Sequence, residues 1–590
     1  MPDGGSYSDY IREVYIDNIR SVLIIDDDYP TLSEFLTNEK NEKTWRLDPG
    51  KVHNIIKHFR DDRKWLVDIH DGNNISLEDE LVIAQHLYQT DLLILDYELE
   101  KHEIDQGIKA RHIAKELSKT PHFNLVIVHS SKDKPTLFKE MLLSFLPPIT
   151  KELHPVQETK ITELLEELED KNEGIKETIF SAFSEQTYLY YYKHVSSLRQ
   201  DIETNKSEYS EILHILSGLK LSEKVSVIKF LARKLEKELI KKKAISSIGS
   251  PTPRWSNTST DYQWIKVGNA FIAFATKEEA EKETLPDILL HTLAEWAPMP
   301  SRLIMSKIRV ELESKGVLVE DEVLEDPHKF AIWYRDLLEK TDKLSRFVEL
   351  QYTIDRHLVG LGKSIFNEVL RYSNQLIKFE KSDENIIPND IVKTRFNINL
   401  NNDEELIEAV KQHNSYVCTH PPSGWHLTTG HILGFADALW LCLSPACDLV
   451  PNQKTSGHFG DVEGFMPFLG VRLYKAPDSL SKEQINSNKF IFLKTDSGIT
   501  SYCFHDPAKA SANPHWYPLY AFDGGAVNNL GEIEILKSET CADNGLKFSR
   551  HSAKIMYQLY PEYAINLMQG LGQNLSRVGL DYKSYPVPKK

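Results

Sequence analysis

The sequence predicts a multi-domain protein that begins with an α/β domain built on a doubly wound parallel sheet. With 590 residues, the chain is too long for one hydrophobic core. Over residues 1–155, short apolar runs alternate with amphipathic segments. After this region the sequence pattern becomes that of charged helices, and later that of short strands. Strands that alternate with helices are typical of βαβ units, whose parallel strands appear as continuous apolar runs.

Four apolar runs are the predicted strands of the first domain. They are Ser21–Ile25, Trp65–Ile69, Asp91–Leu95 and Leu125–Val128. Helical spacing follows the second and third runs, at Leu77–Tyr88 and at Asp105–Leu117. Residues 37–63 are charged and weakly periodic, so we expect them to be an insertion.

The rest of the chain is predicted to form three further parts. Residues 156–245 have the spacing of charged helices, and we expect this section to transmit a signal or to form a homodimer. The Ser-, Thr- and Pro-rich segment 245–260 is the predicted linker, where cleavage should release two folded fragments. Residues 261–393, with a hairpin at Trp264–Ala275, are expected to be mixed α/β, and residues 394–590 a β-rich effector domain. Further helices are expected at Leu285–Trp296, Arg302–Lys315, Pro327–Leu350 and Tyr563–Val578.

Composition narrows the function classes. The chain has 70 Lys and Arg against 87 Asp and Glu, a net charge of −17, which argues against a broad nucleic-acid or membrane surface but leaves room for a local basic patch. No apolar window is long enough to span a membrane, and the first residues lack the pattern of a signal peptide. The five cysteines include no CxxC pair. We therefore expect a cytoplasmic protein.

Carboxylates follow two of the predicted strands. Asp26 and Asp27 come directly after the first strand, and Asp96 ends the third. In an open parallel sheet, ligands bind beyond the carboxyl ends of the strands, at the point where the strand order reverses. Converging carboxylates repel one another unless a cation neutralises them, and oxygen-only ligands favour Mg²⁺. An aspartate beside such a metal can attack phosphorus, while Mg²⁺ offsets the charge on the transferring group.

These stretches resemble a known family. VLIIDDDYP, LLILDYEL and LVIVHSS are similar to the first, third and fourth strands of response-regulator receiver domains, over about residues 18–155. The resemblance implies that Asp26, Asp27 and Asp96 hold Mg²⁺ with the backbone carbonyl of Glu98. It also implies that Asp96 accepts the phosphoryl group.

Three further positions are assigned by the same resemblance. The family places Thr or Ser after its fourth strand; strand register puts His129 there, but we prefer Ser130 because a hydroxyl can donate to a phosphoryl oxygen. The family also has a lysine after its fifth strand, for which Lys151 is the first candidate and Lys134 the second. Gly107 lies where the family often has a glycine that opens the third helix.

A second group of reactive side chains lies in the C-terminal part. Its members are Cys418, His420, His426, His431, Cys442, Cys447 and Asp448. They include every ligand type that zinc uses, although the spacing matches no zinc module. Cys447 with Asp448 and a histidine could instead make a thiol nucleophile. We favour a hairpin with buried cysteines.

The resemblance implies an atypical response regulator that a histidine kinase or kinase-like ATPase phosphorylates. The large C-terminal part would be the effector, by analogy with multi-domain regulators of stress or phage defence. One alternative is a hydrolase or nuclease whose site lies in residues 395–590 and which the receiver regulates. Another is a pseudo-receiver scaffold that assembles a partner complex without phosphotransfer.

Overall fold

The protein forms two compact units, Met1–Ser306 and Lys307–Lys590. The computed structural model describes residues 6–29, 53–54, 56–72, 90–99, 105–149, 155–242, 251–257, 260–282, 284–324, 327–382, 387–451, 464–477, 480–485, 489–508, 513–540 and 545–575. The predicted helix at Leu77–Tyr88 and most of the predicted insertion lie outside these residues.

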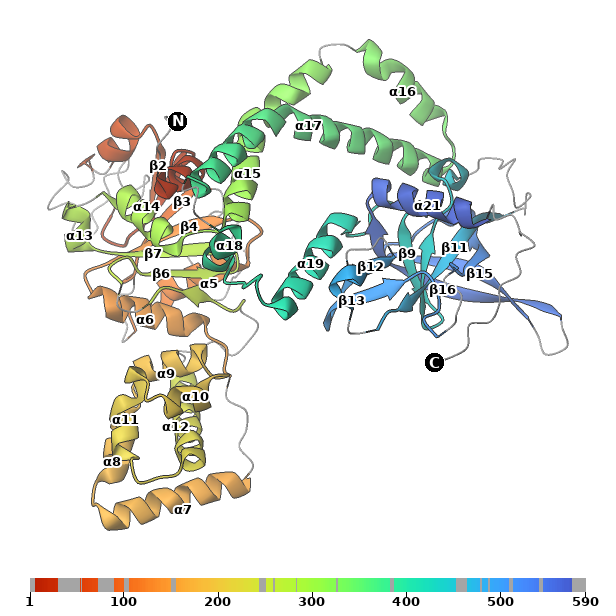
Figure 1. The fold of residues 1–590 in the computed structure, drawn as a ribbon. Helices are drawn as coiled ribbons and strands as arrows, with labels where there is room; N and C mark the ends of the chain where they lie inside the picture. The colour runs from red at the N-terminus through yellow and green to blue at the C-terminus, as the bar shows by residue number, and fades with distance from the viewer. Residues whose placement is uncertain are drawn as a thin grey trace. The chain divides into compact units, whose positions relative to one another are not determined.

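The first unit is built on a seven-stranded sheet (Figure 1). Its strands are β1 (Ser21–Ile25), β2 (Leu66–His70), β3 (Leu92–Asp96), β4 (Asn124–Ser130), β5 (Arg254–Trp255), β6 (Trp264–Val267) and β7 (Ala270–Thr276). Their order is β2-β1-β3-β4-β7-β6-β5. The first five strands in this order are parallel, whereas β6 and β5 are antiparallel to their neighbours.

This sheet confirms the four predicted strands and corrects the expectation of a purely parallel sheet within residues 1–155. The fifth parallel strand is β7, which lies beyond the predicted linker 245–260 and pairs with β4 along its length. Its sequence, AFIAFAT, is the continuous apolar run expected of a strand buried on both faces. The antiparallel hairpin of β6 and β7 then makes the sheet mixed.

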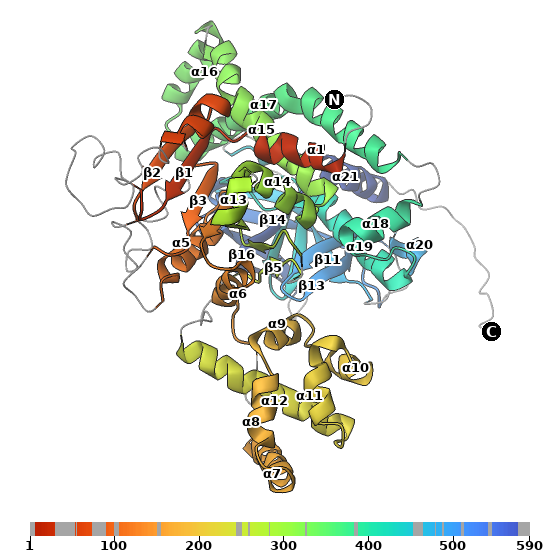
Figure 2. The same ribbon diagram turned by 90° about the vertical axis from the view of Figure 1, so that its left-hand side faces the viewer.

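Helices cover both faces of the sheet (Figure 2). They are α1 (Tyr7–Ile11), α5 (Ile108–Lys119), α6 (Lys134–Phe145), α13 (Lys277–Lys282) and α14 (Leu285–Trp296), with π-helical turns at Arg12–Ile16 and His58–Asp62. Val126 and Val128 of β4 lie in one buried cluster with residues of α5 and α6. Because side chains alternate along a strand, the residues between them face the opposite layer, where α1 packs against α14.

A helical bundle is inserted between α6 and β5. Its helices are α7 (Pro155–Lys171), α8 (Ile175–Ala182), α9 (Glu185–Lys193), α10 (Leu198–Glu203), α11 (Ser210–Ile215) and α12 (Leu221–Lys241), with a 3₁₀ turn at Ser207–Tyr209. The bundle shares one hydrophobic core with α6 and the sheet. The carboxylate of Glu236 accepts hydrogen bonds from the Tyr188 hydroxyl at 2.8 Å and from the backbone N–H of Ile149 at 2.9 Å. Lys139 of α6 pairs with Glu185 of α9 at 2.8 Å.

The second unit begins with helices and ends in an antiparallel β-barrel region. The helices are α15 (Pro300–Leu324), which starts in the first unit, and α16 (His328–Glu339), α17 (Lys343–Glu380), α18 (Pro388–Phe396), α19 (Asp403–Cys418), α20 (Lys482–Ile485) and α21 (Pro561–Leu575). The strands are β8 (Thr419–His420), β9 (His431–Phe435), β10 (Ala438–Cys442), β11 (Phe465–Lys475), β12 (Phe490–Thr495), β13 (Gly498–Cys503), β14 (Trp516–Phe522), β15 (Glu532–Thr540) and β16 (Leu546–Leu559). The order β10-β9-β16-β15-β14-β11 closes on itself because β11 also pairs with β10.

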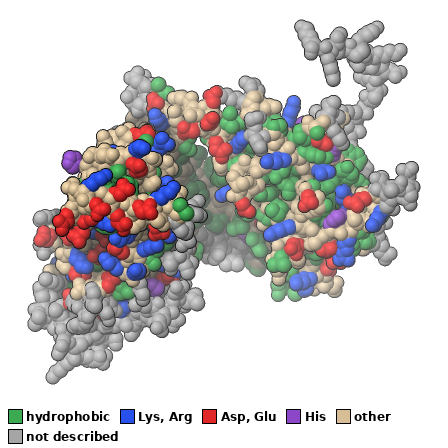
Figure 3. Space-filling model, turned by 90° about the horizontal axis from the view of Figure 1, so that it is seen from below, with side chains coloured by type: hydrophobic (Ala, Val, Ile, Leu, Met, Phe, Trp, Pro, Cys, Tyr) green, Lys and Arg blue, Asp and Glu red, His purple; other side chains and the backbone are tan. Residues whose placement is uncertain are grey.

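Charged side chains of both signs are interspersed on the face that Figure 3 shows. In the described parts of the chain, no helix is long and apolar enough to cross a membrane.

Candidate functional site

Two predicted site residues lie side by side where the strand order reverses. Asp26 follows β1 directly, and Asp96 is the last residue of β3, the strand that pairs with β1. The carboxyl ends of these parallel strands meet at one edge of the sheet, which is the usual ligand position in such folds. The two side chains are only 5% and 3% exposed. The sheet therefore buries two carboxylates at its switch point.

Backbone groups and one lysine hold these carboxylates. The N–H of Asp28 donates to Asp26 Oδ1 at 2.9 Å, and the N–H of Glu98 donates to Asp96 Oδ1 at 3.1 Å. The ammonium of Lys277, the first residue after β7, lies 3.2 Å from Asp96 Oδ2. Asp96 is thus fixed between a backbone donor and a cation.

The pocket keeps an excess of negative charge. Burial, followed by repulsion from Asp96, raises the pKa of Asp26 to about 7. Burial lowers the pKa of Lys277, but attraction by Asp96 and Asp26 outweighs it and leaves that pKa above its ordinary value. One ammonium group does not balance the carboxylates around it, so the site favours binding of a cation.

Mg²⁺ fits this set of donors. Asp26, Asp27 and Asp28 can each place a carboxylate oxygen within 4.8 Å of the others, and no sulfur or nitrogen ligand is among them. Asp27 and Asp28 are half-buried, beside the fully buried Asp26. Hard oxygen ligands with a partly open side suit Mg²⁺, which usually keeps several waters. Receiver domains typically bind Mg²⁺ through such an aspartate cluster.

The hydroxyl predicted to contact a phosphoryl group has other partners. Ser130 is fully buried at the end of β4; its Oγ donates to Glu98 Oε2 at 3.3 Å and accepts from the N–H of Lys132 at 3.0 Å. Ser131 Oγ donates to the same carboxylate oxygen at 2.5 Å. The side chain of Glu98 is thus held on the two serines.

His129 of β4 is the residue that pairs with Asp96 of β3 in the parallel register of these strands. Burial, with repulsion from Lys277, lowers the pKa of His129 to about 4 although Asp96 attracts its charged form. The ring is therefore neutral at physiological pH.

The lysine of the site is one that sequence reasoning missed. Lys151 lies outside the described residues. Lys134 opens α6, where it pairs with Glu279 and donates to the carbonyl of Asp261 at 2.8 Å. Lys277 follows the fifth parallel strand and contacts Asp96 instead. In the sequence, the lysine directly follows the apolar run AFIAFAT, as expected for a residue after a buried strand. The inserted bundle separates this run from the first four strands.

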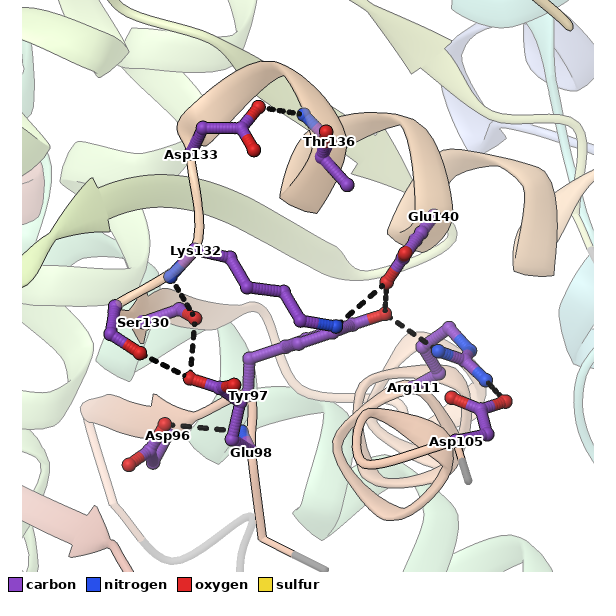
Figure 4. Close-up of polar contacts among 11 residues, drawn as sticks. Asp96, Tyr97, Glu98, Asp105, Arg111, Ser130, Lys132, Asp133, Thr136 and Glu140 are labelled. Atoms are coloured by element: carbon purple, nitrogen blue, oxygen red, sulfur yellow. Dashed lines mark hydrogen bonds and ion pairs between the residues drawn. The ribbon is translucent and has the colours of Figure 1, made fainter. Parts of the chain in front are cut away.

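The residue after Asp96 links the site to two helices (Figure 4). Tyr97 is fully buried; its hydroxyl donates to Glu140 Oε2 on α6 at 2.6 Å and accepts from Arg111 Nη1 on α5 at 2.6 Å. Lys132 lies 3.6 Å from the same Glu140 oxygen. Gly107 packs under this ring, because a Cβ there would come within 2.1 Å of Tyr97 Cζ. The glycine thus has a steric role at the start of α5.

Three of the seven reactive residues of the C-terminal part, His420, His431 and Cys442, lie in strands of the second unit. Cys442 is fully buried in β10, and burial raises its pKa to about 12. His431 is buried in β9, and burial lowers its pKa to about 4. Cys447 is exposed, with its Sγ 3.6 Å from Asp448 Oδ1. Within the described residues, the carboxylate group of the first unit is the one potential metal-ligating cluster.

Comparison with known proteins agrees with the geometry of the first unit. Residues 18–178 match the family model of the response receiver domain. No curated protein and no solved structure matches the chain. The match ends within α8, so β7 and Lys277 lie beyond it. The match thus identifies a response receiver domain over residues 18–178, in the N-terminal part of this 590-residue chain.

Proposed function

We propose that this protein is an atypical response regulator in which phosphorylation of Asp96, with Mg²⁺ bound, controls the second unit through the inserted helical bundle. The observation that carries the proposal is the arrangement of Asp26, Asp96 and Lys277 at the switch point of the sheet. Asp96 is held by a backbone N–H on one carboxylate oxygen and by the Lys277 ammonium on the other.

The chemistry is transfer of a phosphoryl group to a carboxylate. An oxygen of Asp96 forms the new bond to phosphorus while the bond from phosphorus to a histidine nitrogen of the kinase breaks, and that nitrogen takes up a proton from solvent. Bound Mg²⁺, held by Asp26, Asp27 and Asp96 with the carbonyl of Glu98, would offset the negative charge of the carboxylates and the phosphoryl group. The Lys277 ammonium would pair with a phosphoryl oxygen on Asp96.

The route to the rest of the chain runs through α6. Tyr97 joins the end of β3 to Glu140 of α6, and Lys139 of the same helix pairs with Glu185 of the bundle. A new charge on Asp96 would compete for Lys277 and for the Ser130 hydroxyl, which now contacts Glu98. A shift of these partners would move the start of α6 and, with it, the bundle.

Beryllofluoride, which imitates a phosphoryl group on a carboxylate, tests the proposal. The full chain should bind it only in the presence of Mg²⁺, and binding should raise the melting temperature by mass action. Hydrogen exchange should change at residues 130–149 and in the bundle, and sedimentation should report a change in oligomeric state. Asp96→Asn should abolish all of these responses.

Two lysine variants make a matched pair for this experiment. Lys277→Gln should weaken beryllofluoride binding at least about tenfold, which corresponds to loss of about 1.4 kcal/mol. Lys134→Gln should leave it unchanged, because Lys134 pairs with Glu279. If the wild type does not bind beryllofluoride with Mg²⁺, the pseudo-receiver scaffold is the better account. If it binds but hydrogen exchange changes only around Asp26 and Asp96, the proposed transmission through α6 and the bundle is wrong. The assignment of the phosphorylation site would then be retained.

A further inference from the structure

Aromatic rings gather at the edge of the sheet opposite to Asp96. Phe123 immediately precedes β4, and Phe271 is the second residue of β7. Their ring centroids lie 6.4 Å and 5.0 Å from that of Trp296, which ends α14. Tyr15 lies 5.5 Å from Phe123 on the same face. These rings form an aromatic floor at the amino ends of β4 and β7.

Cationic side chains converge on this floor. The guanidinium carbon of Arg302, in the first turn of α15, lies 4.7 Å from the centroid of Phe123 and 5.2 Å from that of Trp296. The ammonium of Lys266 lies 5.4 Å from the Phe123 centroid. Arg254 of β5 stands directly opposite Lys266 of β6 in the antiparallel register. Three positive side chains therefore share one face.

This arrangement is unfavourable without an anion. Residues directly opposite in an antiparallel pair have neighbouring side chains, and like charges there destabilise the pair. Arg302 adds a third charge at a helix N-terminus, where the backbone dipole is already positive. Among the described residues, none of the three forms an ion pair with a carboxylate, and the buried Nε of Arg302 has no hydrogen-bond partner.

Electrostatics around Lys266 lead to the same conclusion. Burial, then repulsion from Arg302 and from Arg254, lowers the pKa of Lys266 to about 8. Its ammonium donates to the carbonyl of Gly268. Burial and the two neighbouring guanidinium groups thus all disfavour the positive charge of Lys266, and no carboxylate is among the groups that shift its pKa.

We propose that Arg254, Lys266 and Arg302 form a binding site for a phosphate-bearing small molecule. A phosphate group supplies the missing negative charge and several acceptor oxygens, and the guanidinium fork matches its geometry. The aromatic rings hold Lys266 and Arg302 in place before a ligand binds, which lowers the entropic cost of binding. Arg254 is exposed and the other two are half-buried, so a solute can reach them. The small number of cations and the net charge of −17 favour a small molecule over a nucleic acid.

Titration of the full chain with pyrophosphate tests this site. The buffer contains EDTA, so that Asp26 and Asp96 hold no Mg²⁺ and the proposed phosphorylation site does not contribute. Pyrophosphate should bind by calorimetry and raise the melting temperature. Arg302→Gln and Lys266→Gln should each weaken binding at least about tenfold. Arg254→Gln should weaken it too, without lowering the melting temperature of the free protein, because the variant removes a like-charge pair.

Lys193→Gln is the matched control. Lys193 also lies over a ring, 5.5 Å from the centroid of Trp255, but it is exposed and that ring lies on the other face of β5. This variant should bind pyrophosphate as the wild type does. The proposal is contradicted if the wild type does not bind pyrophosphate, or if Arg302→Gln binds it equally well. In either case the cations would only stack on the aromatic rings. Tighter binding of a DNA duplex than of pyrophosphate, lost in the same variants, would assign the site to a nucleic-acid backbone and contradict a small-molecule ligand.

Discussion

A chain that ends at Lys242 should fail to form a stable fold, whereas a chain that ends at Ser306 should fold by itself. The shorter chain holds β1 to β4 and the whole bundle but lacks β5, β6 and β7. Its strand β4 would lose its parallel partner, from Asn124 to Ser130. The exposed edge would be flanked by apolar surface on both faces of the sheet.

The expected loss of stability is comparable to the total stability of an ordinary domain. Five of the missing residues, Ile265, Phe271, Ile272, Phe274 and Val267, are at most 1% exposed. At about 1.5–3 kcal/mol for each large buried side chain, their loss rivals the total of about 5–15 kcal/mol that keeps a domain folded. Circular dichroism during heating should show a cooperative transition only in the longer chain.

Because β5, β6 and β7 complete the sheet of β1 to β4, a cut in the predicted linker should not separate two independent domains. A protease site engineered into residues 245–250 should yield two fragments that stay in one complex under native conditions, because the cut falls between strands of a single sheet. Separation of the fragments on a sizing column, with both still folded, would show that β5–β7 do not belong to the receiver sheet.

Asp26→Asn should stabilise the Mg²⁺-free protein, and increasingly so as the pH rises from 4 to 7. The pKa of Asp26 is about 7 in the folded protein, because of burial and then Asp96, against 3.8 for an ordinary aspartate. Between these values the folded state binds more protons than the unfolded state, so the stability of the wild type falls as the pH rises. The asparagine side chain does not ionise, so the stability of the variant does not fall with pH for this reason. The difference should reach the order of 4 kcal/mol near pH 7, at 1.36 kcal/mol for each pH unit.

Thermal or urea unfolding in EDTA, repeated at several pH values, measures this difference. Asp28→Asn is the matched control, because repulsion from Asp28 is the smallest influence on the pKa of Asp26 and the variant should change little. Added Mg²⁺ should stabilise the wild type and not Asp26→Asn. A wild type whose stability is constant from pH 4 to pH 7, or an Asp26→Asn protein that is less stable in EDTA, would show that burial and Asp96 do not raise the pKa of Asp26.

The sequence was sufficient to predict the first half of the receiver sheet. The runs that end at Ile25, Leu95 and Val128 each hold four consecutive apolar residues, which is typical of a strand buried on both faces. They placed Asp26 and Asp96 at the ends of the first and third strands, and the structure shows that these two strands pair. The helix at Leu285–Trp296 was also predicted with its observed bounds.

The site lysine could not be found by the same reasoning. Local patterns give strands but not which strands pair, and the bundle of α7 to α12 separates β7 from β4 in the sequence. The hairpin at Trp264–Ala275 was recognised, yet nothing local showed that β7 would pair with a strand so far away along the chain. Similarly, α19 occupies residues that were expected to be β-rich, because tertiary packing decides such mixed patterns.

Mass spectrometry after treatment with acetyl phosphate and Mg²⁺ tests the central claim most directly. An oxygen of Asp96 would displace acetate from phosphorus, and the intact wild-type chain should gain one phosphoryl group. The gain should disappear without Mg²⁺ and in Asp96→Asn, and hydroxylamine should remove the group because it cleaves acyl phosphates. The Lys277→Gln chain should be labelled more slowly than the Lys134→Gln chain. A wild type that gains no phosphoryl group, or an Asp96→Asn chain that gains it equally, would contradict the account.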